Sequence, residues 1–77
     1  MENRIKEVMS AVFEIPYTEI NENSTFDTVK EWDSLKHMNL IIALEDEFQI
    51  IIPDEEVGNL LSFPLIKLII SDLQTGE

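Results

Sequence analysis

The sequence predicts an all-α protein, a small four-helix bundle with three longer helices, one short helix and a long loop between helices 1 and 2. Apolar residues recur at helical spacing in three separate stretches of the chain. The β-branched run at residues 50–52 resembles a strand but has no second strand to pair with. Because the chain has 77 residues, we expect one domain, residues 1–77, with one thin core and no deep enclosed pocket.

The first helix is predicted over residues 2–14. Its apolar positions repeat at i, i+3, i+4, i+7 and i+8 and are Ile5, Val8, Met9, Val12 and Phe13. The helix should stop before Pro16, because a residue that precedes proline disfavours helical geometry.

Residues 17–33 keep no helical period and contain Asn, Ser, Thr and Asp residues typical of turns. A loop this long is either functional or pinned to the core by its own apolar residues. Four side chains are available as pins: Ile20, Phe26, Val29 and Trp32.

The second helix is predicted from Ser34 to about Phe48, with Asp33 and Ser34 as candidates for its N-cap. An extended linker, residues 49–53, should follow.

The short helix is expected to be capped by Asp54 and to run through Glu55, Glu56, Val57 and Asn59, with acidic residues in its first turn. Ser62 is expected to cap the last helix, whose first turn tolerates Pro64. This helix closes the core through residues at helical spacing: Ile66, Ile69, Ile70 and Leu73.

The charge balance limits the possible partners. The chain has 16 acidic and 5 basic residues, a formal net charge of −11. We therefore expect no nucleic-acid partner, since phosphate binding needs Lys and Arg, and we expect partners with basic protein surfaces.

No apolar run approaches the length of a membrane span, so we expect a soluble, cytoplasmic monomer without a membrane role.

The chain contains no cysteine. It can therefore form neither a disulfide nor a thiolate metal site, and any thiol that it uses must arrive on a cofactor. No stretch has the alternating acids and central glycine of an EF-hand, and no metal site is expected.

The second helix has an unusually wide apolar surface. One arc of residues should face the core: Leu40, Ile41, Leu44 and Phe48. A second flank continues past Ser34 and comprises Leu35, Met38 and Ile42. This flank either packs against the short helix or forms a docking patch, with Asn39, Glu45 and Asp46 as its polar neighbours.

Two stretches carry a family resemblance. Asp33-Ser34-Leu35 opens the second predicted helix, and Ala43-Leu44-Glu45-Asp46-Glu47-Phe48 closes it. With the chain length, the four helical segments and the acidic charge, these stretches resemble the acyl carrier protein family over nearly the whole chain.

The resemblance implies a non-enzymatic carrier with Ser34 as the attachment site of 4′-phosphopantetheine, donated from coenzyme A by a Mg²⁺-dependent phosphopantetheinyl transferase (holo-ACP synthase). It implies that Asp33 helps to hold the metal and coenzyme A during this transfer. Acyl groups would travel as thioesters to acyl-transferring and acyl-processing enzymes of fatty acid, polyketide or other specialised acyl biosynthesis. Family contacts with the transferase and partners fall on Leu35, Met38 and Ile42, and its recognition residues fall on Asn39, Glu45 and Asp46.

Three residues depart from the family pattern. Lys36 stands in place of a usual acid, Trp32 in place of a small or aliphatic residue, and Gln49 in place of a usual glycine. We expect these changes to touch the partner-facing surface. They resemble stand-alone carriers of specialised pathways, such as polyketide, unusual acyl-unit or surface-glycan assembly. Peptidyl carriers fit less well, because their Gly-Gly before the serine is absent.

The sequence allows three alternative interpretations. Asp33 and Ser34 could be a plain helix cap, and the chain could be an acidic helical protein-interaction module without a prosthetic group. Ser34 and His37 share a helix face, but a hydrolase would also need an orienting acid, an oxyanion hole and a cleft. His37 is therefore interpreted as a helix residue at the edge of the core.

Overall fold

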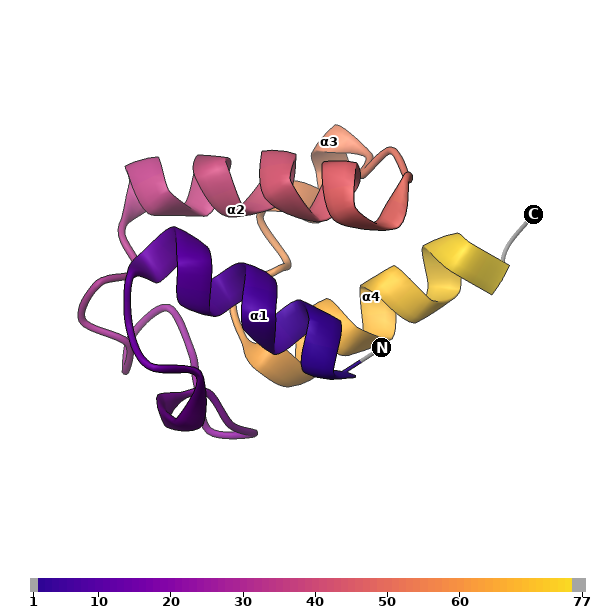
Figure 1. Cartoon of the computed structure of the whole chain (residues 1–77). Helices are drawn as coiled ribbons and strands as arrows, with labels where there is room; N and C mark the ends of the chain where they lie inside the picture. Colours follow the sequence, from indigo (N-terminus) through magenta and orange to yellow (C-terminus); the bar gives the residue numbers. More distant parts are fainter. Residues whose placement is uncertain (1, 76–77) are drawn as a thin grey trace.

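The computed structural model describes residues 2–75, which form four α-helices and one short 3₁₀ turn (Figure 1). The elements are α1 (Glu2–Phe13), η1 (Tyr17–Glu19), α2 (Ser34–Phe48), α3 (Asp54–Val57) and α4 (Phe63–Thr75). The described part of the chain contains no strand, only an isolated bridge between Thr25 and Ser62. The predicted bundle of three longer helices and one short helix is confirmed.

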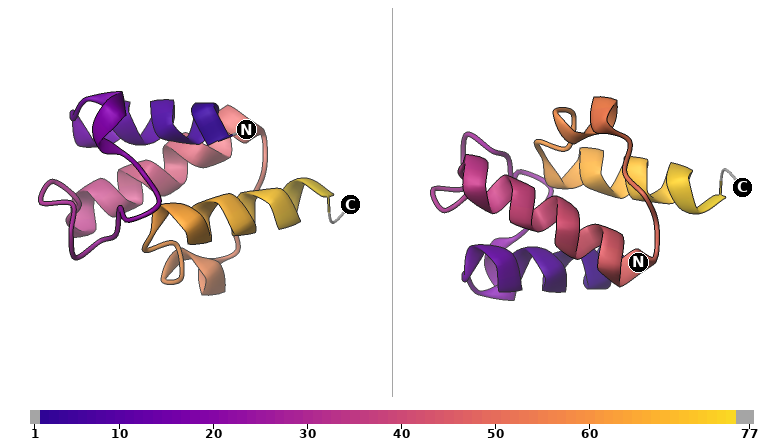
Figure 2. Two further views of the ribbon diagram at one scale, coloured as in Figure 1. Left: turned by 90° about the horizontal axis from the view of Figure 1, so that it is seen from below. Right: turned by 90° about the horizontal axis from the view of Figure 1, so that it is seen from above.

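The helices pack around one another with α2 antiparallel to α1. Seen from above or below, α2 lies between α1 and α4, and the short α3 lies at the outer edge beside α4 (Figure 2). None of the helices among the described residues is long and apolar enough to cross a membrane.

The first helix follows from its apolar spacing, because Ile5, Met9 and Phe13 lie one helical turn apart and are buried. It ends at Phe13, one residue before the predicted end. Glu14 follows in the left-handed conformation with φ of 59°, and its N–H donates to the Ser10 carbonyl at 2.9 Å.

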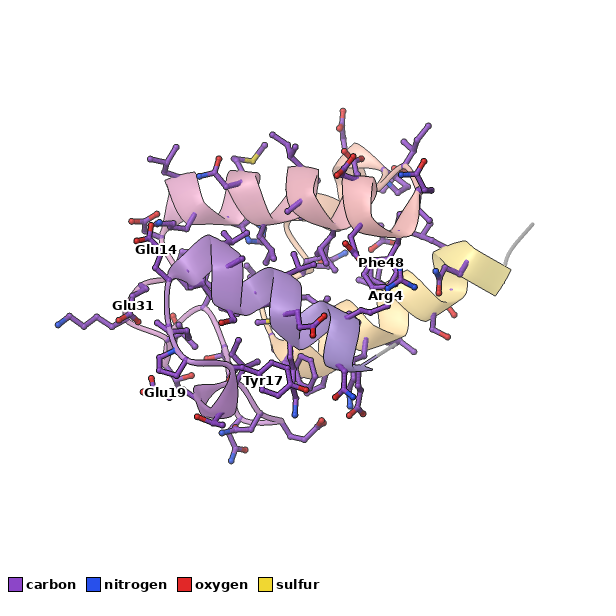
Figure 3. All side chains as sticks on the ribbon, in the orientation of Figure 1. Arg4, Glu14, Tyr17, Glu19, Glu31 and Phe48 are labelled. Carbon is purple, nitrogen blue, oxygen red and sulfur yellow. The ribbon has the colours of Figure 1, made fainter. Side chains whose placement is uncertain are left out.

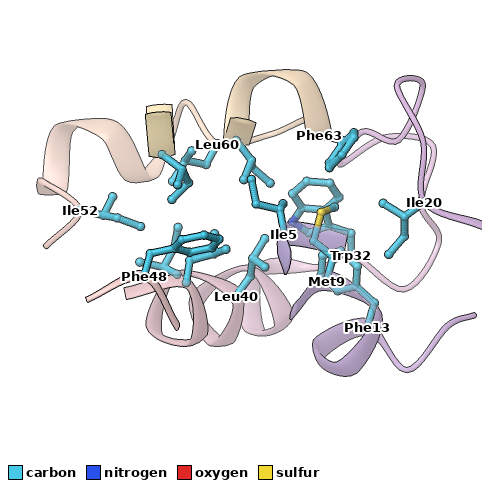
Figure 4. Packing of buried hydrophobic residues seen from close by; sticks show 14 of the residues in the cluster. Ile5, Met9, Phe13, Ile20, Trp32, Leu40, Phe48, Ile52, Leu60 and Phe63 are labelled. Atoms are coloured by element: carbon cyan, nitrogen blue, oxygen red, sulfur yellow. The ribbon is translucent and has the colours of Figure 1, made fainter. Parts of the chain in front are cut away.

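The core is one cluster of buried apolar side chains from α1, α2, α4 and the segments that connect the helices (Figure 4). Its members are Ile5, Met9, Phe13, Ile15, Ile20, Trp32, Leu40, Ile41, Leu44, Phe48, Ile52, Leu60, Phe63, Ile66 and Ile70.

The long loop is pinned by its own apolar residues, which is one of the two alternatives that the sequence left open. Ile20 and Trp32 are buried, and Phe26 and Val29 pack against the core. The Trp32 ring lies 4.9 Å from the Phe13 ring, centroid to centroid. This loop therefore has a fixed path up to the start of α2.

Backbone hydrogen bonds also fix the loop, and sequence periodicity did not predict them. The Phe26 N–H donates to the Leu61 carbonyl, and the Phe63 N–H donates to the Ser24 carbonyl, both at 2.9 Å. These two bonds join the loop to the chain that leads into α4.

The expected cap of the short helix is wrong. Asp54 is the first helical residue of α3, and Pro53 is its N-cap, without a side-chain hydrogen bond. Pro53 takes this place because its ring fixes φ near −59°, and its extended ψ of 146° leads directly into the helix. The helix also ends at Val57, so Asn59 lies beyond it.

The cap of the last helix is as predicted. The Ser62 hydroxyl accepts a hydrogen bond from the Leu65 N–H at 3.2 Å. Residues 50–53 carry no regular structure and form the expected linker.

Candidate functional site

Ser34 is the first residue of α2 and is exposed at the end of the long loop. No hydrogen bond joins its hydroxyl to another described residue. The preceding residue, Asp33, is the N-cap, and its Oδ1 accepts a hydrogen bond from the Lys36 N–H at 2.8 Å. Because Asp33 fulfils the capping role, the Ser34 hydroxyl is left at the surface for other chemistry.

The second apolar flank of α2 is exposed. Leu35 is 71 %, Met38 50 % and Ile42 62 % accessible, whereas the core arc of the same helix is buried. We call these three residues the α2 apolar row. The structure thus answers the question that the sequence left open, because α3 does not cover the row. Side chains project from the outer edge of α2 in Figure 3.

The polar residues near the row are not equivalent. Asn39 and Asp46 are exposed. Glu45 is half-buried, and its Oε2 accepts a hydrogen bond from the Ile52 N–H at 2.8 Å. Glu45 therefore holds the linker after α2, a role that its spacing in the helix did not predict.

Two of the departures from the family pattern face the protein itself. Trp32 is buried, and the Lys36 Nζ donates to the Val12 carbonyl at 3.1 Å and pairs with Glu14 at 3.2 Å. The expectation that these changes touch the partner-facing surface is therefore wrong for Trp32, and the Lys36 ammonium is bound to the end of α1. Packing against α1 decides the direction of both side chains.

Gln49, the third departure, ends α2 in the left-handed conformation, with φ of 55°. This is the conformation in which glycine has no steric penalty. The Gln49 side chain partly compensates by donating from Nε2 to the Asp46 carbonyl at 2.6 Å.

His37 is buried and uses both ring nitrogens in the fold. The Trp32 Nε1–H donates to its Nδ1 at 3.1 Å, and its Nε2 lies 2.8 Å from the Val57 carbonyl oxygen. The ring therefore has no nitrogen left to activate the Ser34 hydroxyl, which excludes a serine hydrolase built on this pair. The sequence placed His37 at the core edge but gave no sign of these bonds.

The basic residues are largely engaged within the chain. Arg4 pairs with Glu47 at 3.0 Å and lies over the Phe48 ring, beside which Figure 3 labels it. Lys67 pairs with Glu2 at 2.8 Å and with Glu22 at 2.7 Å. Since these cations bind the protein's own carboxylates, the charge offered to a partner is mainly negative.

The described residues bring together no group of three His, Cys, Asp or Glu side chains that could hold a metal ion. They also enclose no pocket. The site consists of an exposed serine and an exposed apolar row on one helix.

Comparison with known proteins gives the class of the site. A family model described as "Phosphopantetheine attachment site" matches residues 3–63. The curated "Acyl carrier protein" of Lactobacillus acidophilus is 36 % identical over 67 residues, covering 79 % of this chain and 84 % of that protein. The helical bundle is thus a phosphopantetheine-binding carrier domain. The chain belongs to the acyl carrier protein family.

Family membership supplies the thiol that this cysteine-free chain lacks, because its prosthetic group is a covalently attached 4′-phosphopantetheine. The residues present fit such a group. An exposed serine at a helix start offers a reachable hydroxyl, and the positive end of the helix dipole favours the negative phosphodiester.

Proposed function

We propose that Ser34 is the residue that carries the phosphopantetheine arm, and that the chain delivers acyl groups from this position to partner enzymes. The observation that carries the proposal is the exposed Ser34 hydroxyl, which the Asp33 cap leaves without a structural role at the start of α2. The other helix-start serine, Ser62, uses its hydroxyl to cap α4.

Loading is a transfer of phosphopantetheine to the Ser34 oxygen. The Oγ–P bond forms as the pyrophosphate P–O bond of coenzyme A breaks, adenosine 3′,5′-bisphosphate leaves, and the hydroxyl proton passes to a base of the transferase. When bound, the arm supplies a thiol that holds acyl groups as thioesters. The chain's own part is to present Ser34 on a rigid helix end, with Asp33 beside it for the metal and coenzyme A.

The α2 apolar row is the proposed docking surface for the transferase and for acyl-transferring and acyl-processing enzymes. Leu35, Met38 and Ile42 give its apolar centre, and Asn39 and Asp46 lie at its edge. A partner surface that is apolar at its centre and basic around it complements this arrangement. Glu45 is proposed to contribute charge to this rim while its carboxylate holds Ile52.

The proposed pathways are fatty acid, polyketide and other specialised acyl biosynthesis. The departures from the family pattern resemble carriers of specialised pathways, but Trp32 and Lys36 are engaged in the fold, so the support for a specialised pathway lies mainly in the exposed Gln49. We propose that the carrier acts as a monomer in the cytoplasm, where coenzyme A and the transferase meet it.

The alternative, an interaction module without a prosthetic group, has no support from the family match.

Intact mass tests the attachment site. The protein is incubated with coenzyme A, Mg²⁺ and a broad-specificity phosphopantetheinyl transferase, beside Ser34→Ala and the control Ser62→Ala. We expect one phosphopantetheine on the native chain and on Ser62→Ala, and none on Ser34→Ala. No addition to the native chain, or equal addition to Ser34→Ala, contradicts the proposal.

A further inference from the structure

The chain between α2 and α4, residues 50–60, is attached to the bundle at few points. We call it the α3 segment. Its helix, α3, has four residues, none of them buried, and no side-chain cap. Only Ile52 and Leu60, near its two ends, are buried, and Ile50 and Val57 are partly buried against the core. Segments with few buried contacts open most readily in folded proteins.

Two side chains of α2 hold this segment. The Glu45 carboxylate accepts a hydrogen bond from the Ile52 N–H at 2.8 Å, and the His37 Nε2 bonds the Val57 carbonyl at 2.8 Å. Glu45 and His37 are eight residues apart, about 12 Å along the helix axis. The segment is thus fastened to α2 near both of its ends, each time by a titratable side chain.

The partners of His37 fix its protonation state. An indole N–H can only donate, so the Trp32 Nε1–H requires an unprotonated Nδ1 on His37. A backbone carbonyl can only accept, so Nε2 must carry the hydrogen that binds Val57. Both bonds form together only when the imidazole is neutral, because a second proton would point Nδ1–H at the Trp32 N–H.

None of the side-chain contacts that His37 makes with the described residues involves a carboxylate. The rings of Trp32 and Phe26 lie against the imidazole, and His37 as a whole is only 8 % exposed. Three charged side chains on the neighbouring elements are bound elsewhere: Asp33 to the Lys36 N–H, Lys36 to Glu14 and the Val12 carbonyl, and Glu56 to Asn59. A buried imidazolium without a carboxylate is costly, so the charged ring should turn to water.

We propose that His37 is a proton-sensitive latch: the neutral ring fastens the α3 segment to α2, and the doubly protonated ring releases the segment while α1, α2 and α4 stay folded. Release would uncover apolar side chains on both sides of the contact, among them Ile52 and Leu60 on the segment and Leu40 and Phe48 on α2 (Figure 4). The latch rests on these contacts alone and does not depend on the modification of Ser34.

Amide hydrogen exchange on the full chain tests the latch, expressed as protection factors so that the intrinsic pH dependence of exchange is removed. As the pH falls from about 7.5 to about 5.5, the range in which an imidazole exposed to water takes up its second proton, we expect protection of residues 52–60 to fall. Since one proton is linked to opening, the fall should reach up to about tenfold for each pH unit. Protection of α1 and α4 should change much less.

His37→Gln is the matched variant, because its amide can accept from Trp32 and donate to Val57 without titrating. Its α3 segment should stay protected across the same pH range. Unchanged protection in the native chain, loss of all helices together, or an equal loss in His37→Gln overturns the latch.

Nitrogen NMR of the native chain gives a test that needs no variant. At neutral pH, the His37 ring should carry its hydrogen on Nε2, as its bond to the Val57 carbonyl requires. A hydrogen on Nδ1 overturns the proposal.

Discussion

The Asp33 carboxylate and the Lys36 backbone N–H are joined by a hydrogen bond of 2.8 Å, which makes Asp33 the N-cap of the helix that begins with Ser34. Asp33 therefore has a structural role in addition to its proposed role in phosphopantetheine transfer. The two roles need different properties of the side chain. Capping needs an acceptor oxygen, whereas holding a metal ion needs negative charge.

Substitutions at Asp33 should separate its capping role from its proposed role in phosphopantetheine transfer. Asp33→Ala should lower the free energy of unfolding by about 1 kcal/mol, because α2 loses its cap. Asp33→Asn keeps an acceptor and should leave stability nearly unchanged, yet slow phosphopantetheine transfer. Urea denaturation and the rate of transfer measure the two effects. Normal loading of Asp33→Asn would show that Asp33 acts only as a cap.

The α2 apolar row should matter for partners and little for stability. Ile42→Asp should leave the free energy of unfolding within about 0.5 kcal/mol, because Ile42 is exposed, and should lower kcat/KM of the transferase by about tenfold. Leu68→Asp is the control, since Leu68 on α4 is similarly exposed, at 58 %. Equal losses in the two variants would mean that apolar exposure in general, and not this row, decides recognition.

The left-handed end of α2 predicts a stabilising substitution. Gln49→Gly should raise the free energy of unfolding by about 0.5 kcal/mol, because relief of the left-handed strain outweighs glycine's greater freedom in the unfolded chain. Ala43→Gly, inside the same helix, should lower it by about 0.5–1 kcal/mol. Thermal and urea unfolding compare the two. A loss of stability in both variants would show that the Gln49 side-chain hydrogen bond outweighs the strain.

The ion pair between α1 and α4 should be visible in titrations. The hydrogen bond from the Lys67 ammonium, with its charge, lowers the pKa of the Glu2 carboxyl below 4.5. The carboxylates of Glu2 and Glu22 raise the pKa of Lys67 above 10.5. The contribution of Glu2 to stability is thus present above the ordinary carboxyl pKa and is lost as the pH falls through the lowered value. That of Lys67 is present below 10.5 and is lost as the pH rises through the raised value.

Carbon NMR of the Glu2 carboxyl measures this pair directly. Its midpoint should lie below 4.5 in the native chain and move up in Lys67→Met. An unchanged midpoint in the variant would assign the shift to another cause. The effect on stability should be small, because both side chains are reached by solvent.

Much of the fold could be predicted from the sequence because the apolar residues on a buried helix face recur at a regular spacing. Ile5, Met9 and Phe13 marked α1, and the core arc of α2 was identified in the same way. The cap of α3 could not be predicted, because Pro53 and Asp54 both suit a helix start.

The site was predicted in part. The sequence separated Leu35, Met38 and Ile42 from the core arc. Their exposure depends on the position of α3, which hydrophobic periodicity does not predict. The bonds of His37 with Val57 and of Glu45 with Ile52 join residues from different elements. Such pairs leave no repeat in the sequence, so only the three-dimensional arrangement shows them.

Trp32 is the one tryptophan of the chain, two residues before Ser34, and its N–H is bonded to His37. Indole emission responds to the polarity and hydrogen bonding around the ring. The protein thus contains an intrinsic fluorophore at the junction between the loading end and the α3 segment. Structural changes at the Ser34 end of α2 or in the α3 segment can be followed in real time on unlabelled protein, with an optical signal that comes from a single residue.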